Sequence, residues 1–190
     1  ALGGPLLDTM YHHGWAWAGD SPFLSTKLVA GHFGGTRTPL VISWPRRIKP
    51  DKTPRGQFHH VNDVAPTILD ILGTEQPKKF NGIEQKPMEG VSFAYTFAAD
   101  GAKAPDRKKT QYFEMMGHRS LYHDGWRAVC PWPGPSFTEA GAFFGAPISK
   151  DKLTELDAEN WELYHVDFDF AQNHDVAAQP PDHLISLTAH

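Results

Sequence analysis

The chain has 190 residues with 18 basic and 22 acidic side chains, a net charge of -4, and 40% hydrophobic residues. This length and apolar content suffice for one domain, or one and a half, with a core of its own, which excludes a disordered tail. The lack of a basic excess disfavours nucleic acid as a partner, and no run of about 18 apolar residues is present that would span a membrane.

The cysteine content and the first residues bear on localisation and on whether the chain is part of a longer protein. The single cysteine, Cys130, cannot form an internal disulfide, so localisation stays open between cytoplasm and periplasm. The chain begins with Ala1 and has neither an initiator methionine nor the charged start and apolar centre of a signal peptide. We therefore expect a piece of a longer protein, with the missing N-terminal part as its partner.

The first 25 residues are rich in glycine, proline and aromatic side chains, which predicts an irregular segment. His12 and His13 stand there beside Trp15 and Trp17. Two interpretations stay open for these side chains. They line a substrate pocket, which makes His12 and His13 candidate substrate-binding residues, or they pack within a buried loop.

The next stretch places Lys27 and Arg37 on either side of the pair Gly34-Gly35. Glycine has no Cβ, so such a pair allows a sharp bend and a close approach to a ligand. A cation on each side suits an oxyanion such as sulfate or phosphate, whereas the alternative is a tight turn with solvated basic residues. Residues 40–44 follow as a continuous apolar run, which predicts a strand covered on both faces.

An amphipathic helix is predicted over residues 61–72, where apolar side chains recur at steps of three and four. Asn62 is its expected N-cap and Gly73 is placed to end it. A buried strand followed by such a helix is one unit of an α/β layer. Residues 74–109 are mostly polar and broken by glycine and proline, which predicts a wandering excursion over the surface.

Antiparallel strands are expected in the second half of the chain. Asp124-Gly125 is a strong tight-turn signal, with strand-like sequence on either side of it. The expected strands cover residues 111–115, 119–122, 126–129 and 161–166, and a terminal helix is expected to begin at residues 182–187.

The predicted fold is therefore α/β with an α+β continuation. Residues 1–100 form the end of an α/β domain, and residues 101–190 form a small antiparallel sheet with a C-terminal helix. No internal repeat is visible in the sequence.

Together these motifs resemble the C-terminal third of a type I sulfatase, in the alkaline-phosphatase-like superfamily. The sequence GGTRTPLVISWP at residues 34–45 leads into HVNDVAPTILDILG at residues 60–73. The hairpin at residues 119–129 and the closing ELY at residues 162–164, followed by NHDVA, resemble later motifs of the family. The resemblance covers nearly the whole chain, and residues 14–23 are most similar to the bacterial arylsulfatase branch.

The resemblance implies hydrolysis of a small-molecule sulfate ester to an alcohol or phenol plus sulfate. Lys27 takes the place of the family lysine that contacts the substrate sulfate, so it is the candidate catalytic residue. A flexible ammonium group suits a sulfate oxygen whose negative charge grows in the transition state. Arg37 is a candidate substrate-binding residue, but we expect it to order the turn rather than to contact the substrate.

The resemblance also implies a formylglycine nucleophile and a calcium ion for the full-length protein. Formylglycine is made from the first residue of Cys-x-Pro-x-Arg or Ser-x-Pro-x-Arg, and CPWPG at residues 130–134 fails that motif. Residues 43–47 match the serine form by letter, but we reject them because the family motif opens a helix, whereas here a proline-broken loop follows. We expect no metal ligands in this chain. It would contribute Lys27 and pocket walls, and would be inactive alone.

Two alternatives to an arylsulfatase stay open. One is a phosphate or phosphonate monoester hydrolase of the same superfamily, which shares the fold and the cationic pocket. The other is a non-catalytic glycan- or partner-binding module, whose surface would consist of the aromatic side chains Trp132, Phe137, Phe143 and Phe144.

Overall fold

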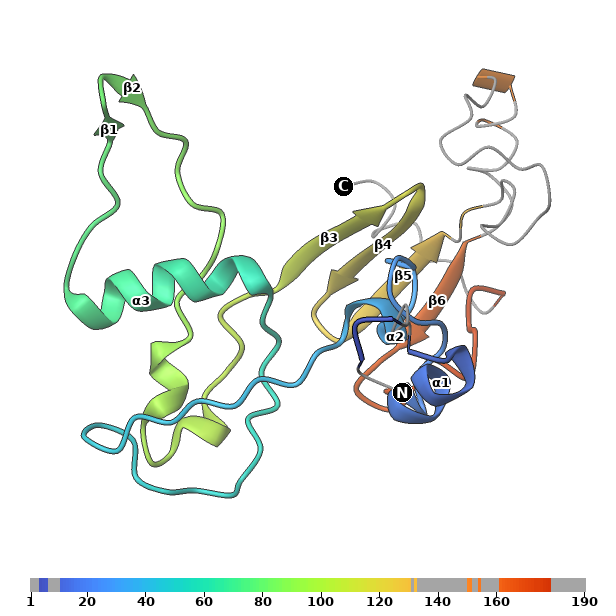
Figure 1. Ribbon diagram of the computed structural model, residues 1–190, viewed down its shortest axis with the longest axis horizontal. Coiled ribbons are helices and arrows are strands. Elements are labelled where there is room, and N and C mark those ends of the chain that lie inside the picture. Colours follow the sequence, from blue (N-terminus) through green and yellow to red (C-terminus); the bar gives the residue numbers. More distant parts are fainter. Residues whose placement is uncertain are drawn as a thin grey trace. The chain divides into compact units, whose positions relative to one another are not determined.

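The computed structural model describes residues 4–6, 11–130, 132, 150–151, 154 and 161–178. The chain divides into two units, one made of Ala1–Thr38 with Tyr112–His190 and the other of Pro39–Gln111 (Figure 1). The expected boundary near residue 100 concerns the domains of a longer protein and stays a prediction.

A four-stranded sheet forms the centre of the first unit, with its strands in sequence order. The strands are β3 (Thr110–Met115), β4 (His118–His123), β5 (Trp126–Cys130) and β6 (Glu162–His165). β5 pairs antiparallel with both β4 and β6, as the sequence predicted. Asp124 and Gly125 have φ of 44° and 85°, which is the conformation that a two-residue hairpin turn requires. The expected helix at residues 182–187 lies outside the described residues.

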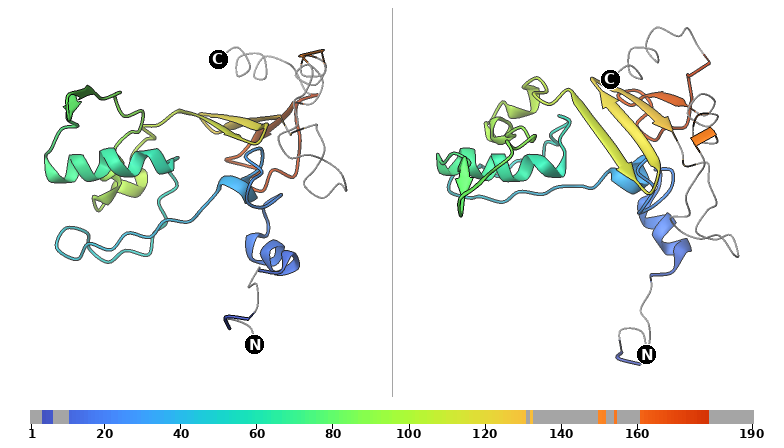
Figure 2. Two further views of the ribbon diagram at one scale, coloured as in Figure 1. Left: turned by 45° about the horizontal axis from the view of Figure 1, so that its top comes forward. Right: turned by 90° about the horizontal axis from the view of Figure 1, so that it is seen from above.

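The two faces of this sheet have different neighbours. On one face, Ala128 and Leu163 are buried and form a small apolar core. Partly buried side chains pack around that core: Leu121, Trp126, Trp161, Val176 and Ala177. The other face carries Arg127, which lies opposite Tyr122 on one side and Tyr164 on the other. Residues 30–36 lie against this second face, as the views of Figure 2 also show.

A helix stands where the sequence predicted an irregular segment. α1 (His13–Asp20) begins at His12, whose side chain accepts a hydrogen bond from the Gly14 amide at 3.1 Å. A histidine cap and an alanine-containing two-turn helix are weak signals beside the glycine and tryptophan content, so the composition was misleading here. A single helical turn, α2 (Phe33–Thr36), follows the loop after α1.

The glycine pair of α2 is explained by contact with the chain's own backbone. A Cβ on Gly34 would lie 2.1 Å from the Ser25 carbonyl oxygen, and one on Gly35 would lie 2.0 Å from that of Val29. These distances exclude any side chain, since carbon and oxygen in contact lie more than 3 Å apart. The glycines therefore allow α2 to pack directly on the loop of residues 25–29.

The second unit contains the predicted helix. A 3₁₀ turn, η1 (Val61–Asp63), leads into α3 (Val64–Leu72), and Gly73 ends the helix with φ of 63°, as expected. The N-cap of η1 is His60, not Asn62. The His60 side chain accepts a hydrogen bond from the Asn62 amide, and the Asp63 carboxylate accepts one from the His60 amide. Asp63 is fully buried and also accepts from the Lys108 ammonium at 2.9 Å.

The strand predicted at residues 40–44 is not formed. These residues have no assigned secondary structure, and Val41 is 90% exposed. Ile68 and Leu72 on the apolar face of α3 are also exposed, and Thr67 is the helix residue that is buried. A strand needs a neighbour to hydrogen-bond with, and the described residues supply none for this run. The expected α/β unit is therefore incomplete within the described residues, because its helix is present and its strand is not.

The excursion at residues 74–109 is mostly irregular, as predicted. It contains a short hairpin and two 3₁₀ turns. These are β1 (Lys79–Phe80), β2 (Ile83–Glu84), η2 (Ala94–Phe97) and η3 (Gly101–Lys103).

Replacing Gly35 by alanine tests the close packing of α2. We expect Gly35→Ala to lower the free energy of unfolding by about 2 kcal/mol, because the new methyl group would displace the Val29 backbone. The matched control is Gly19→Ala in α1, where nothing lies within 4 Å of the added Cβ. Alanine there should raise stability by about 0.5 kcal/mol. Urea unfolding followed by tryptophan fluorescence measures both changes, and equal stability of the two variants would contradict this packing.

Candidate functional site

The candidate catalytic residue lies in the loop between α1 and α2. Lys27 is exposed, and the loop around it is tightly bent: Ser25 and Leu28 have φ of 64° and 76°. The Val29 amide donates to the Thr26 carbonyl at 3.3 Å, which closes a turn around Lys27. Lys27 is therefore exposed to solvent on a tightly bent turn.

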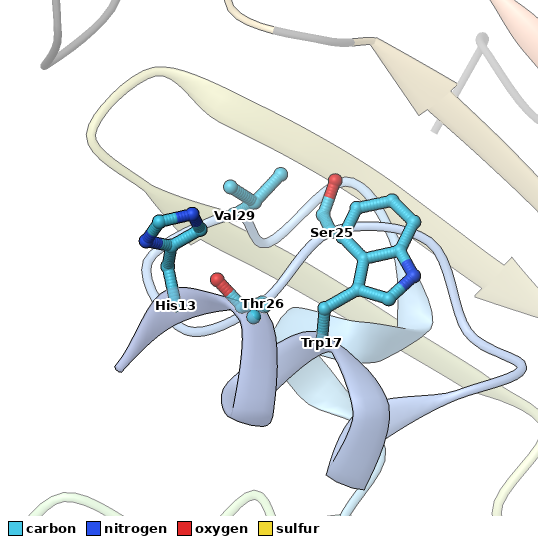
Figure 3. A pocket seen from close by; sticks show the side chains of 6 residues that line it. His13, Trp17, Ser25, Thr26 and Val29 are labelled. Atoms are coloured by element: carbon cyan, nitrogen blue, oxygen red, sulfur yellow. The ribbon is translucent and has the colours of Figure 1, made fainter. Parts of the chain in front are cut away.

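A pocket of about 510 Å³ lies beside this turn. His13 and Trp17 from α1 face Ser25, Thr26 and Val29 from the loop across it (Figure 3). Its lining thus combines two ring systems with two hydroxyl groups. Because Thr26 and Val29 are lining residues, the pocket adjoins the turn that carries Lys27.

The structure separates the roles of the two histidines. His13 lines the pocket, whereas the Nδ1 atom of His12 caps α1. The two rings stack with their centroids 4.4 Å apart, so His12 supports the ring that faces the pocket. Of the pair, His13 is the one that the structure brings to the Lys27 loop.

Arg37 lies at the end of α2 and contacts aromatic rings. Its guanidinium carbon is 5.2 Å from the ring centre of Phe23 and 5.2 Å from that of Phe33. Such cation–π contacts tie the residues before Lys27 to those after Gly35. Whether Arg37 binds substrate or orders the turn stays a prediction.

A buried arginine that the sequence analysis did not single out holds residues 30–36 on the sheet. Arg127 is 0% exposed, and its Nη2 donates to the Ala30 carbonyl at 3.0 Å and to the Thr36 hydroxyl at 3.0 Å. Burial lowers the pKa of Arg127 to about 9, so it remains a cation at neutral pH. A charged residue inside the apolar strand WRAVC was the available signal for this site.

His32 and Glu162 form a second contact between residues 30–36 and the sheet. His32 is mostly buried, with Nε2 3.7 Å from a carboxylate oxygen of Glu162. Burial first, and then the positive charge of Arg127, lower the pKa of His32 to about 4, so the ring is neutral near pH 7. Burial raises the pKa of Glu162, whose carboxylate accepts from the Tyr164 hydroxyl at 2.8 Å.

The start of α2 has its own partner from the C-terminal part of the chain. The Gln172 side-chain oxygen accepts a hydrogen bond from the Phe33 amide at 2.7 Å, and Gln172 is 1% exposed. This bond satisfies an amide that a helix start leaves without a partner. Residues far apart in sequence therefore fix the turn that follows Lys27.

Neither a metal centre nor a formylglycine position is found in the described part of the chain. No group of three or more His, Cys, Asp or Glu side chains comes together there as a cation site. Cys130 is buried at the end of β5 with its sulfur 3.2 Å from Arg119, and exposed Ser43 precedes a turn rather than a helix. The described residues therefore do not fit calcium, and the side chains at the Lys27 loop are an ammonium group, hydroxyl groups and aromatic rings. Across the same described residues, no helix combines the length and apolar character needed to cross a membrane.

Comparison with known proteins finds similarity to sulfatases. The family model described as N-sulphoglucosamine sulphohydrolase, C-terminal, matches residues 32–121. An uncharacterised sulfatase of Schizosaccharomyces pombe is 26% identical over 178 residues, which cover 91% of this chain and 27% of that protein. The N-acetylglucosamine-6-O-sulfatase of Bacteroides thetaiotaomicron is 25% identical over 135 residues, covering 70% of this chain and 20% of that protein.

Two further matches are found. An ulvan-active sulfatase of Formosa agariphila is 37% identical over 54 residues, which cover 28% of this chain and 11% of that protein. A solved structure from work on the metabolism of multiple glycosaminoglycans by Bacteroides thetaiotaomicron matches with a TM-score of 0.50 at 17% identity. That match covers 85% of this chain and 29% of the solved one, and it shows a shared fold. This chain spans 27% or less of the length of the curated relatives. Residues 32–121 therefore match a sulfatase-family C-terminal region, and the curated relatives that the chain resembles are sulfatases.

Proposed function

We propose that this chain is the C-terminal part of a sulfuric ester hydrolase, in which Lys27 contacts the sulfate group of the substrate. The observation that carries the proposal is the position of Lys27, which is exposed on a tightly bent turn beside a pocket, in a chain whose relatives are sulfatases. When the S–O bond of a sulfate ester breaks, negative charge grows on oxygen. An ammonium group held in place stabilises that charge.

The nucleophile and the metal are proposed to belong to the remaining length of a protein of the relatives' size. Formylglycine and calcium are the family's means of attacking and polarising the sulfate, and the described residues hold neither. What this chain supplies is a cation on a tightly bent turn and one wall of the substrate site. Such a division predicts that the chain by itself does not hydrolyse sulfate esters.

Two kinds of ester are candidates for the substrate. The resemblance to bacterial arylsulfatases favours an aryl sulfate, while two relatives are named for action on N-acetylglucosamine 6-O-sulfate and on ulvan, which favours a sulfated saccharide. Assaying the full-length protein with an aryl sulfate, a sulfated monosaccharide and an aryl phosphate separates them. Faster turnover of the phosphate than of both sulfates would replace the proposed activity by phosphomonoester hydrolysis.

Removal of the Lys27 ammonium tests the site directly. In the full-length protein we expect Lys27→Ala to lower kcat for the preferred sulfate ester by about 10- to 1000-fold, the range for loss of one charge-stabilising group. Lys49→Ala, which removes another exposed lysine, is the control and should leave turnover unchanged. Wild-type kinetics for Lys27→Ala would remove Lys27 from the site.

Ser43 tests the rejected nucleophile motif. Ser43 is exposed, and residues 44–48 form a turn, so the serine does not open a helix. We expect Ser43→Ala to keep nearly all turnover of the same ester. If that variant lost its activity while remaining folded, Ser43 would instead be the formylglycine precursor.

A further inference from the structure

The loop of Lys27 is connected to the sheet through one short segment, residues 30–36. Ala30, three residues after Lys27, accepts hydrogen bonds from the Ser120 hydroxyl at 2.8 Å and from Arg127 at 3.0 Å. Thr36, at the other end of the segment, accepts from the same Nη2 atom of Arg127. Arg127 therefore holds both ends of residues 30–36 at once.

The segment in turn fixes the backbone on both sides of Lys27. Gly34 and Gly35 pack so closely on the carbonyl groups of Ser25 and Val29 that no Cβ fits between them. The Gly34 amide also donates to the Leu24 carbonyl at 3.0 Å. Because interiors packed this closely do not deform freely, a shift of residues 30–36 moves the Lys27 turn with it.

From these contacts we propose that Arg127 is a positioning residue for Lys27, an inference that rests on the proposed function of Lys27. Arg127 is 0% exposed, so it does not touch the substrate and acts through the segment it anchors. The C-terminal hairpin thereby sets the position of the sulfate-contacting ammonium group.

An arginine suits this role where a lysine does not. Its planar guanidinium contacts the rings of Phe33 and Phe113, with ring centres 4.4 Å and 5.0 Å from the guanidinium carbon. The two N–H groups of Nη2 are shared among three acceptors, the Ala30 carbonyl and the hydroxyls of Thr36 and Ser120. The compact, strongly hydrated ammonium group of a lysine stacks poorly on aromatic rings.

Arg127 also costs the fold stability. Its Nε and Nη1 atoms are buried and have no hydrogen-bond partner within the described residues. Burying a cation with unpaired donors is unfavourable, and an apolar residue would fill the site at lower cost. Rules of packing are broken in this way at functional sites, which agrees with a positioning role.

A double-mutant cycle in the full-length protein tests the proposal. We expect Arg127→Lys to lower kcat by up to about 100-fold, the loss that a displacement of about 1 Å produces, and by no more than Lys27→Ala does, with a smaller change in KM. The variant with both Lys27→Ala and Arg127→Lys should be no slower than Lys27→Ala alone, because Arg127 acts through Lys27. Additive losses, or wild-type kcat in Arg127→Lys, would overturn the positioning role.

Two further variants make the cycle decisive. Arg119→Lys is the matched control, because Arg119 is on β4 of the same sheet but stacks over Trp161 on the opposite face, and it should leave kcat unchanged. If Arg127→Lys fails to fold, Thr36→Val replaces it in the cycle, because it removes one acceptor of Arg127 and leaves the arginine in place. The same non-additive result with Lys27→Ala is expected, and additivity would overturn the proposal.

The cycle also separates this proposal from the function on which it rests. Lys27→Ala with wild-type turnover would overturn both the sulfate contact and the positioning of that contact. A loss with Lys27→Ala, combined with additive behaviour of Arg127→Lys, would overturn the positioning role and keep the proposed function.

Discussion

The hydrogen bonds from Arg127 to Ala30 and Thr36 are the contact on which the rest of the first unit depends. A buried guanidinium group needs acceptors, and it takes them from backbone and hydroxyl groups of a turn that is distant in sequence. The group is shielded from water and also contacts the rings of Phe33 and Phe113. The buried guanidinium group of Arg127 therefore joins the sheet to residues 30–36.

Two local features of the chain make this contact possible, the hairpin turn of the sheet and the glycine pair of α2. The tight Asp124-Gly125 turn fixes the register that places Arg127 between Tyr122 and Tyr164, on the face away from the small apolar core. On the other side of the contact, the absence of Cβ atoms at residues 34 and 35 lets the turn reach the loop before it. Sequence signals that look local, a hairpin turn and a glycine pair, thus combine to determine where Lys27 stands.

Local signals explain which parts of this structure were predictable. The sheet was predicted because Asp124-Gly125 and the flanking residues determine pairing between neighbours in sequence. α1 was missed because its cap is a histidine, and the strand expected at residues 40–44 is absent because pairing depends on neighbours, which the sequence pattern of the run itself does not reveal. Lys27 was singled out first as a cation near the glycine pair and then by the resemblance, and its role stays a prediction. Arg127 was missed because its partners lie about 90 residues away, and long-range pairing leaves no periodic pattern.

The central claim is that a sulfatase substrate meets the Lys27 ammonium on a turn that the sheet holds in place. A crystal structure of the full-length protein with a bound sulfate ester or sulfate ion tests it most directly. We predict that Lys27 Nζ lies about 3 Å from a sulfate oxygen, with the Arg127 bonds to Ala30 and Thr36 intact. A sulfate group held by other cations, with Lys27 turned to solvent, would contradict the claim.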